Sequence, residues 1–117
     1  MKLAVHCAAL LALMLAILPR VESAEVLNGV KSRGQLRCGV SEDIPGFAER
    51  DGSGYWRGLE ADFCRAVAAA VLNDPEKVEF VPLQTTARFP ALQTRRVDLL
   101  LANTTWTLTR EAVLRVR

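Results

Sequence analysis

The chain has 117 residues, of which half are hydrophobic, 24% are charged and 6% are aromatic, and its formal net charge at pH 7 is +2. A charge this balanced excludes the basic footprint of a nucleic-acid-binding surface, so we expect no nucleic acid among the partners. The hydrophobic content argues against intrinsic disorder, and the length suits one small domain rather than two.

The N-terminus has the three-part pattern of a secretory signal peptide. Lys2 supplies a positive start, residues 3–18 form an apolar run, and a proline then precedes a stretch of small residues. Cleavage after Ser23 would place small, uncharged residues at both recognition positions. The apolar run is shorter than the ~20 residues that a membrane-spanning helix needs, which disfavours an anchor. We therefore predict a signal peptide over 1–23, a periplasmic location and a mature chain over 24–117.

Removal of that peptide restricts the available chemistry. The only histidine, His6, leaves with it, so the mature chain lacks the base of the usual catalytic triads and the commonest zinc ligand. Two cysteines, Cys38 and Cys64, remain. In an exported chain they either form a disulfide or stay as two buried thiols, and the sequence leaves both possibilities open. No metal and no cofactor is predicted.

The mature part alternates helices and strands. An amphipathic pattern predicts a first helix over 26–34, and alternation of polar and apolar residues predicts a first strand over 35–40. A loop follows over 41–47, and the turn residues 51–54 mark the tip of a hairpin. The later elements are a helix over 58–73, a strand over 78–83, a helix over 87–94 capped by Thr85 or Thr86, and a strand over 97–102.

Two of these later elements carry further information. In the helix over 58–73, Leu59, Phe63 and Val67 recur at helical spacing, and Glu60 lies in the first turn, where the helix dipole favours an acid. The strand over 97–102 has the continuous apolar composition of a strand buried on both faces. Its one charge, Asp98, is expected to be a structural charge satisfied by a partner.

Strands that alternate with helices predict an α/β domain with a mainly parallel sheet flanked by helices. In such sheets the ligand lies beyond the carboxyl ends of the strands, which here means the loops over 41–47, 83–86 and 103–110. The last loop carries several hydroxyls and amides and ends in Arg110, a combination that suits a carboxylate, with Trp106 as an apolar wall. The alternative is a solvated threonine-rich loop. Because no nucleophile–base pair is present, the sequence favours binding over catalysis and predicts no enzyme.

Specific stretches resemble a known family. They are Leu-Arg-Cys-Gly-Val, Gly-Leu-Glu-Ala-Asp-Phe-Cys-Arg-Ala-Val, Arg-Phe-Pro-Ala-Leu-Gln, Val-Asp-Leu-Leu and Asn-Thr-Thr-Trp-Thr. Together they resemble the periplasmic solute-binding proteins of bacterial amino-acid ABC importers, the extracellular solute-binding proteins of family 3. The Asp-Phe-Cys and Asn-Thr-Thr-Trp-Thr motifs resemble those of the general L-amino-acid-binding subgroup of this family. The resemblance covers residues 26–112.

This resemblance implies a two-lobed α/β protein of the type II periplasmic-binding-protein fold that closes on a free L-amino acid and delivers it to inner-membrane ABC permease subunits. It implies that Arg110 holds the α-carboxylate and that Phe47 or Trp106 supplies an apolar wall. The remaining ligand-binding residues that it implies are Asn103, Thr105, Thr107, Ser41 and Thr85.

The chain departs from the family in length. Relatives are much longer and cross to a second lobe soon after the position of Arg110, whereas residues 113–117 here do not continue the pattern well. We therefore expect an incomplete N-terminal lobe, a truncated copy without the second lobe and the hinge, which would bind weakly or not at all. The alternatives are a non-functional remnant and an enzyme on the same fold. The preferred amino acid stays open.

Overall fold

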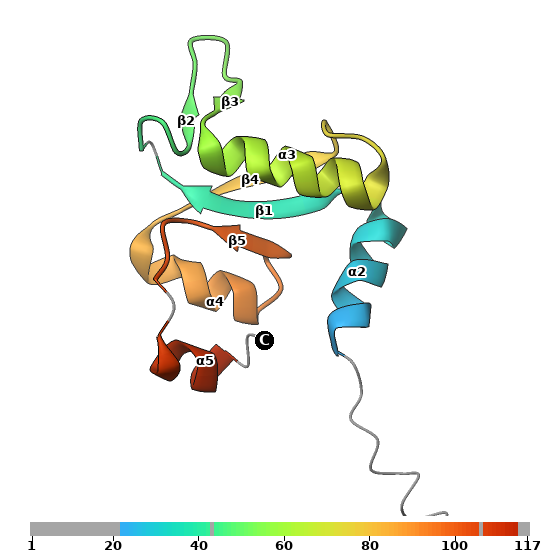
Figure 1. The fold of residues 1–117 in the computed structure, drawn as a ribbon, viewed down its shortest axis with the longest axis vertical. Coiled ribbons are helices and arrows are strands. Elements are labelled where there is room, and N and C mark those ends of the chain that lie inside the picture. Colours follow the sequence, from blue (N-terminus) through green and yellow to red (C-terminus); the bar gives the residue numbers. More distant parts are fainter. Residues whose placement is uncertain (1–21, 43, 106, 115–117) are drawn as a thin grey trace, which may run out of the picture.

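The computed structural model describes residues 22–42, 44–105 and 107–114, and the predicted signal peptide lies almost wholly outside this part. Helices and strands alternate along the chain, as the sequence predicts (Figure 1). The described elements are α2 (Glu22–Arg33), β1 (Leu36–Ser41), β2 (Glu49–Arg50), β3 (Trp56–Arg57), α3 (Leu59–Leu72), β4 (Val78–Leu83), the 3-10 turn η1 (Thr85–Ala87), α4 (Arg88–Gln93), β5 (Leu99–Leu101) and α5 (Leu108–Leu114).

The main sheet has three parallel strands in the order β4-β1-β5, so β1 is central. Ser41 pairs with Leu83 of β4, and Val40 pairs with Leu101 of β5, which brings the carboxyl ends of all three strands to one edge. The predicted α/β layer with a parallel sheet is confirmed. The short strands β2 and β3 form the predicted antiparallel hairpin outside this sheet.

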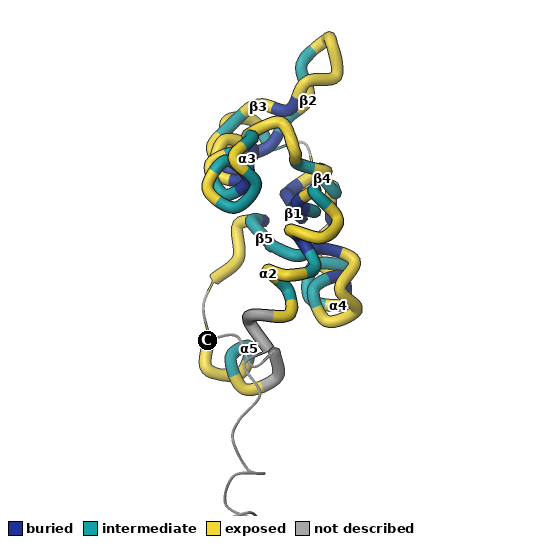
Figure 2. Tube along the Cα trace, turned by 90° about the vertical axis from the view of Figure 1, so that its right-hand side faces the viewer, coloured by how far each residue is buried: buried dark blue, intermediate teal, exposed yellow. Residues whose placement is uncertain are grey.

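The two faces of the sheet are covered by different helices. Cys38 and Val40 of β1 are fully buried in a cluster with residues of α3, and α4 packs on the other side against Leu83 (Figures 1 and 2). Gly39 of β1 leaves room on this side for side chains of the neighbouring strands, because a Cβ there would lie 2.8 Å from Leu83 Cδ1 of β4 and 3.1 Å from Leu100 Cδ1 of β5. Each face therefore has its own small core.

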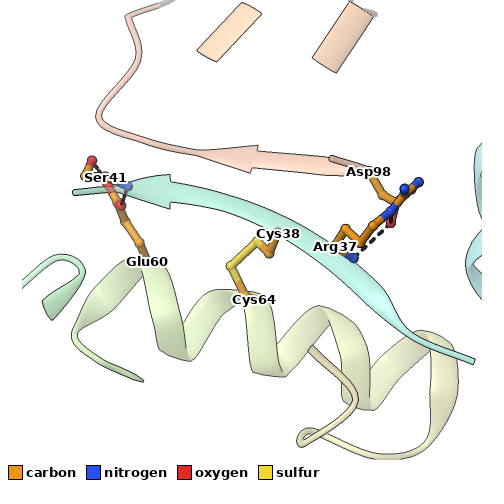
Figure 3. Close-up of a disulfide and its surroundings, with 6 residues drawn as sticks. All are labelled: Arg37, Cys38, Ser41, Glu60, Cys64 and Asp98. Carbon is orange, nitrogen blue, oxygen red and sulfur yellow. Dashed lines mark hydrogen bonds and ion pairs between the residues drawn. A yellow bond between two sulfur atoms is a disulfide. The ribbon is translucent and has the colours of Figure 1, made fainter. Parts of the chain in front are cut away.

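A disulfide joins the central strand to the helix above it. Cys38 of β1 and Cys64 of α3 are bonded, with both residues fully buried (Figure 3). Of the two states that the sequence leaves open for these cysteines, the structure has the bonded one.

The apolar spacing that predicts α3 does not mark its buried face. Leu59 and Phe63 are 65% and 54% exposed, whereas the helix turns Ala61, Cys64 and Ala68 toward the sheet. The reason is distance: small side chains let the helix approach β1 closely enough for a disulfide whose Cα atoms are 6.2 Å apart.

Several expected boundaries also differ. The first helix begins at Glu22 rather than at residue 26, and the third opens with η1 after Gln84, so neither Thr85 nor Thr86 caps it with its side chain. The strand over 97–102 shortens to β5, whose residues are only half-buried because β1 is its one strand partner in the described chain. The loop over 103–110 ends early, since α5 begins at Leu108. Within the described chain, no helix is both long and apolar enough to cross a membrane.

Candidate functional site

The edge formed by the carboxyl ends of the strands gathers four of the predicted ligand-binding residues. Ser41 ends β1, Thr85 follows β4 and Asn103 follows β5, while Phe47 lies in the loop after β1. Thr85, Asn103 and Phe47 are exposed, and Ser41 is fully buried. Since these segments are far apart in the sequence, the parallel sheet alone brings them together, as expected for a ligand-binding edge.

A buried carboxylate from α3 joins two of these strand ends. Glu60 is 6% exposed, and its Oε2 accepts a hydrogen bond from Ser41 N (2.8 Å) while its Oε1 accepts one from Ser41 Oγ (3.0 Å) (Figure 3). Oε1 also accepts a hydrogen bond from Asn103 N at 3.0 Å. Both Ser41 donors are used in this way. Ser41 thus supports the edge from below and presents no free donor at the surface.

Glu60 was not predicted as part of this edge, because its position in the sequence indicated only a favourable interaction with the helix dipole. A usable signal exists: Glu60, Cys64 and Ala68 follow one another at intervals of four residues and form one helix face. A carboxylate on a face that also carries a cysteine and alanines is positioned for burial, and a buried carboxylate requires donors. The donors that the Glu60 carboxylate contacts are set by the order of the strands in the sheet, which the sequence of the helix does not contain.

The loop after β1 is attached to the start of α3 through backbone groups. The carbonyl oxygens of Gly46 and Phe47 accept hydrogen bonds from Leu59 N (3.0 Å) and Glu60 N (2.9 Å), which satisfies two N–H groups that the first turn leaves unpaired. Gly58 makes this contact possible, because its φ is 107° and a Cβ there would lie 2.5 Å from Phe47 O. The Phe47 side chain, 41% exposed, is held at the edge by this loop.

The other predicted ligand residues line a separate hollow of about 380 Å³ beside β5. Arg110, Thr105 and Thr107 border it, together with the apolar side chains of Phe89 and Leu92. The Arg110 guanidinium lies 4.9 Å from the centre of the Phe89 ring, and its Nη1 donates to Thr105 O at 2.7 Å. In this structure Arg110 therefore faces α4 rather than Ser41 and Thr85. Trp106 lies outside the described residues.

Asp98, at the amino end of β5, has the structural role expected of it. Its carboxylate forms ion pairs with Arg33 and, at 3.1 Å, with Arg37, and it accepts the backbone N–H of Arg37 at 2.9 Å. Burial by itself raises the pKa of Asp98, but the Arg37 hydrogen bonds and the two positive charges outweigh burial and hold the pKa below its usual value. Asp98 thus fastens α2 and β1 to the start of β5.

The described residues contain no group of three or more His, Cys, Asp or Glu side chains that could hold a metal ion. The strand-end edge offers hydrogen-bond donors and acceptors and an exposed aromatic side chain, and the hollow beside β5 offers a guanidinium and apolar side chains. Such groups are of the kind that bind and orient small polar ligands in protein pockets.

The fold and this edge define the class of protein: a partial α/β domain of the type II periplasmic-binding-protein kind. A periplasmic binding protein from Brucella ovis, solved with glutathione bound, has a TM-score of 0.73 and 49% identity, covering 75% of this chain and 27% of its own. The arginine-bound domain 1 of TmArgBP has a TM-score of 0.61 at 27% identity, covering 72% and 64%. An ancestral amino-acid-binding protein, a precursor of cyclohexadienyl dehydratase, has a TM-score of 0.65 at 34% identity, covering 74% and 37%.

Sequence comparison places the chain within one family. The profile of the bacterial extracellular solute-binding proteins, family 3, matches residues 36–116, and the chain belongs to this family. The general L-amino acid-binding periplasmic protein AapJ of Rhizobium johnstonii is 45% identical over 97% of this chain. The glutamate/glutamine/aspartate/asparagine-binding protein BztA of Rhodobacter capsulatus is 46% identical over 85% of it. The chain spans about a third of the length of these relatives, 33% of AapJ and 29% of BztA.

Proposed function

We propose that this chain is the ligand-binding edge of a periplasmic receptor that takes up free L-amino acids and delivers them to the permease subunits of an ABC importer. Arg110 pairs with the α-carboxylate, and Thr105, Asn103 and the neighbouring backbone donate or accept hydrogen bonds. Phe47 and Trp106 supply the apolar walls, and the predicted signal peptide over 1–23 directs the chain to the periplasm.

The observation that carries this proposal is the state of Arg110. Its Nη1 donates to Thr105 O, and among the described residues Nε and Nη2 have no hydrogen-bond partner. A guanidinium with two donors available suits the two oxygens of a carboxylate, which it binds as a fork. The adjoining Thr105 and Thr107 are exposed and border the same hollow.

The relatives support an amino acid as the ligand class. BztA is named for glutamate, glutamine, aspartate and asparagine, and AapJ for general L-amino acids. The TmArgBP neighbour is a single domain described as arginine-bound, so one domain of a related protein is sufficient to hold a ligand there. The present chain covers 64% of that domain. Of the two outcomes expected for an incomplete lobe, weak binding or none, this favours weak binding.

We also propose that the chain is a binding protein and not an enzyme. The ancestral neighbour described as a precursor of a dehydratase raises the alternative that the chain is an enzyme, and a reactive carboxylate near a strand end would support that alternative. Glu60 is a carboxylate that lies beside two strand ends. Because it is buried and both of its oxygens already accept hydrogen bonds, it is poorly suited to act as a general base.

Thermal unfolding with a panel of L-amino acids tests the proposal. A ligand that binds only the native state at 100 times its Kd stabilises it by about 2.7 kcal/mol, which is a measurable shift in midpoint. We expect a shift with L-glutamine, L-glutamate or L-arginine and none with the D-isomers. Arg110→Ala should weaken binding about 10- to 100-fold, as expected when a hydrogen-bonded charge pair is lost, whereas Arg96→Ala, at an exposed position, should not. If no L-amino acid changes the midpoint of the wild-type chain, the proposal is wrong.

A further inference from the structure

Glu60 is unusual among the acidic residues of the described chain because it is buried without a cation. It forms none of the ion pairs found there, and its charge is balanced only by the three donors from Ser41 and Asn103. Such donors are drawn close to a carboxylate and bind it more strongly than they bind a neutral acceptor. One side chain thus contacts two backbone N–H groups, one at the end of β1 and one in the turn just after β5.

Those two N–H groups stand where the two loops of the proposed site begin. Ser41 is the last residue of β1, and Asn103, whose φ of 45° is left-handed, starts the turn that leads out of β5. From Asn103 the contacts continue outward, because Thr105 O accepts the hydrogen bond from Arg110 Nη1. A continuous path therefore runs from Glu60 through the loop after β5 to the guanidinium.

The carboxylate is itself held in place along the strand. Cys64 lies one helical turn after Glu60 on α3, and its disulfide partner Cys38 lies three residues before Ser41 on β1 (Figure 3). The disulfide and the Glu60 contacts form two attachments between the same helix and the same strand. Because of the first attachment, α3 cannot slide, and the oxygens of Glu60 stay opposite the strand ends.

We propose that Glu60 is a positioning residue of the amino-acid site: its carboxylate sets where the loop over 103–105 leaves β5 and thereby where Thr105 and Arg110 meet the ligand. For the ligand itself this inference rests on the proposed function. Its local consequence, the ordering of Asn103 by a carboxylate on α3, holds without any ligand.

Amide hydrogen exchange by NMR tests the local consequence on the full chain. Glu60→Gln removes the charge that strengthens all three hydrogen bonds and leaves a single oxygen to accept them, so we expect the Asn103 amide to exchange at least about 10-fold faster relative to the Val40 amide of the same sheet. Glu79→Gln, which removes a charge from an exposed side chain of β4, should leave that ratio unchanged. A purely structural role would speed both amides equally, through global unfolding, and that result would overturn the proposal.

Glu60→Asp keeps the charge but withdraws both oxygens by the length of one carbon. If Glu60→Gln fails to fold, this second variant allows the same comparison of the Asn103 and Val40 exchange rates. We expect the Asn103 amide to lose protection relative to Val40 in this variant too, and an unchanged ratio would overturn the proposal.

Ligand binding by the same variants is measured next. Glu60→Gln should weaken the binding of L-glutamine or L-arginine at least about 10-fold, and Glu79→Gln should not. If the wild-type chain binds neither, the proposed function fails while the exchange ratio still decides the role of Glu60.

Discussion

The disulfide between Cys38 and Cys64 allows a quantitative prediction. The two residues are 26 positions apart in the sequence, and closing a loop of that length removes entropy from the unfolded chain worth about 3.5 kcal/mol at 25 °C. Reduction adds two hydrogen atoms and converts the bond into two thiols, which behave as small buried hydrophobic groups once the two sulfur atoms have moved apart. The loss of stability on reduction should therefore be close to the loop term alone.

For a domain of this size each kcal/mol changes the thermal unfolding midpoint by roughly 4–8 °C, so reduction should lower this midpoint by about 14–28 °C. Thermal unfolding followed by circular dichroism, with and without a phosphine reductant, measures this shift, and urea unfolding gives the free-energy difference. A variant with Cys38→Ala and Cys64→Ala together is the control, because a reductant should not change its midpoint. Thiol titration in denaturant first establishes whether the bond is present.

Two results would refute this reasoning. If both thiols titrate before any reductant is added, the contact between β1 and α3 is not covalent in solution. If the bond is present but reduction costs less than about 1 kcal/mol, the unfolded chain is already restricted near these residues and the loop estimate does not apply.

Two other predictions concern single substitutions. Gly58→Ala should destabilise the chain by at least about 2 kcal/mol, because the φ of 107° is strained for alanine and the new Cβ would meet Phe47 O. Gly52→Ala is the control, since a Cβ there meets open space and should cost little. Equal urea midpoints for the two variants would contradict this prediction. Asp98→Asn should cost about 1–3 kcal/mol at neutral pH through its lost Arg37 contacts. Because the folded pKa of Asp98 is lowered, this difference should shrink as the pH falls below about 4 and through that pKa, and a constant difference from pH 7 to 3 would contradict it.

The order of the elements could be predicted from local patterns, since strand alternation, helical spacing and turn residues act over a few neighbouring positions. The boundaries were less accurate, as at α2 and β5. The edge at which we propose that the ligand binds was also predictable, because parallel strands connected by helices must place their carboxyl ends together. Asn103 and Thr85 do lie at that edge, whereas the position of Arg110 beside Phe89 required the packing of α4 and α5.

The buried face of α3 could not be predicted from hydrophobicity. Leu59 and Phe63 are more hydrophobic than the alanines of the opposite face, yet they remain exposed because the helix lies close to β1 and is bonded to it through Cys64. The space between helix and sheet selects small residues there, and this space is a property of the packed layers rather than of the helix. The same packing converts Glu60 from a first-turn acid into the buried acceptor of two strand ends.

By itself, the sequence of this protein determined the α/β class, the chain order of its elements, the parallel sheet and the family resemblance. Each of these features is indicated by patterns of residues that are close together along the chain. The tertiary structure alone decided which side of α3 is buried, that Cys38 meets Cys64, and that Glu60 joins Ser41 to Asn103. These are contacts between residues that are 19–43 positions apart, and only the layered packing of helix on sheet brings such groups within bonding distance.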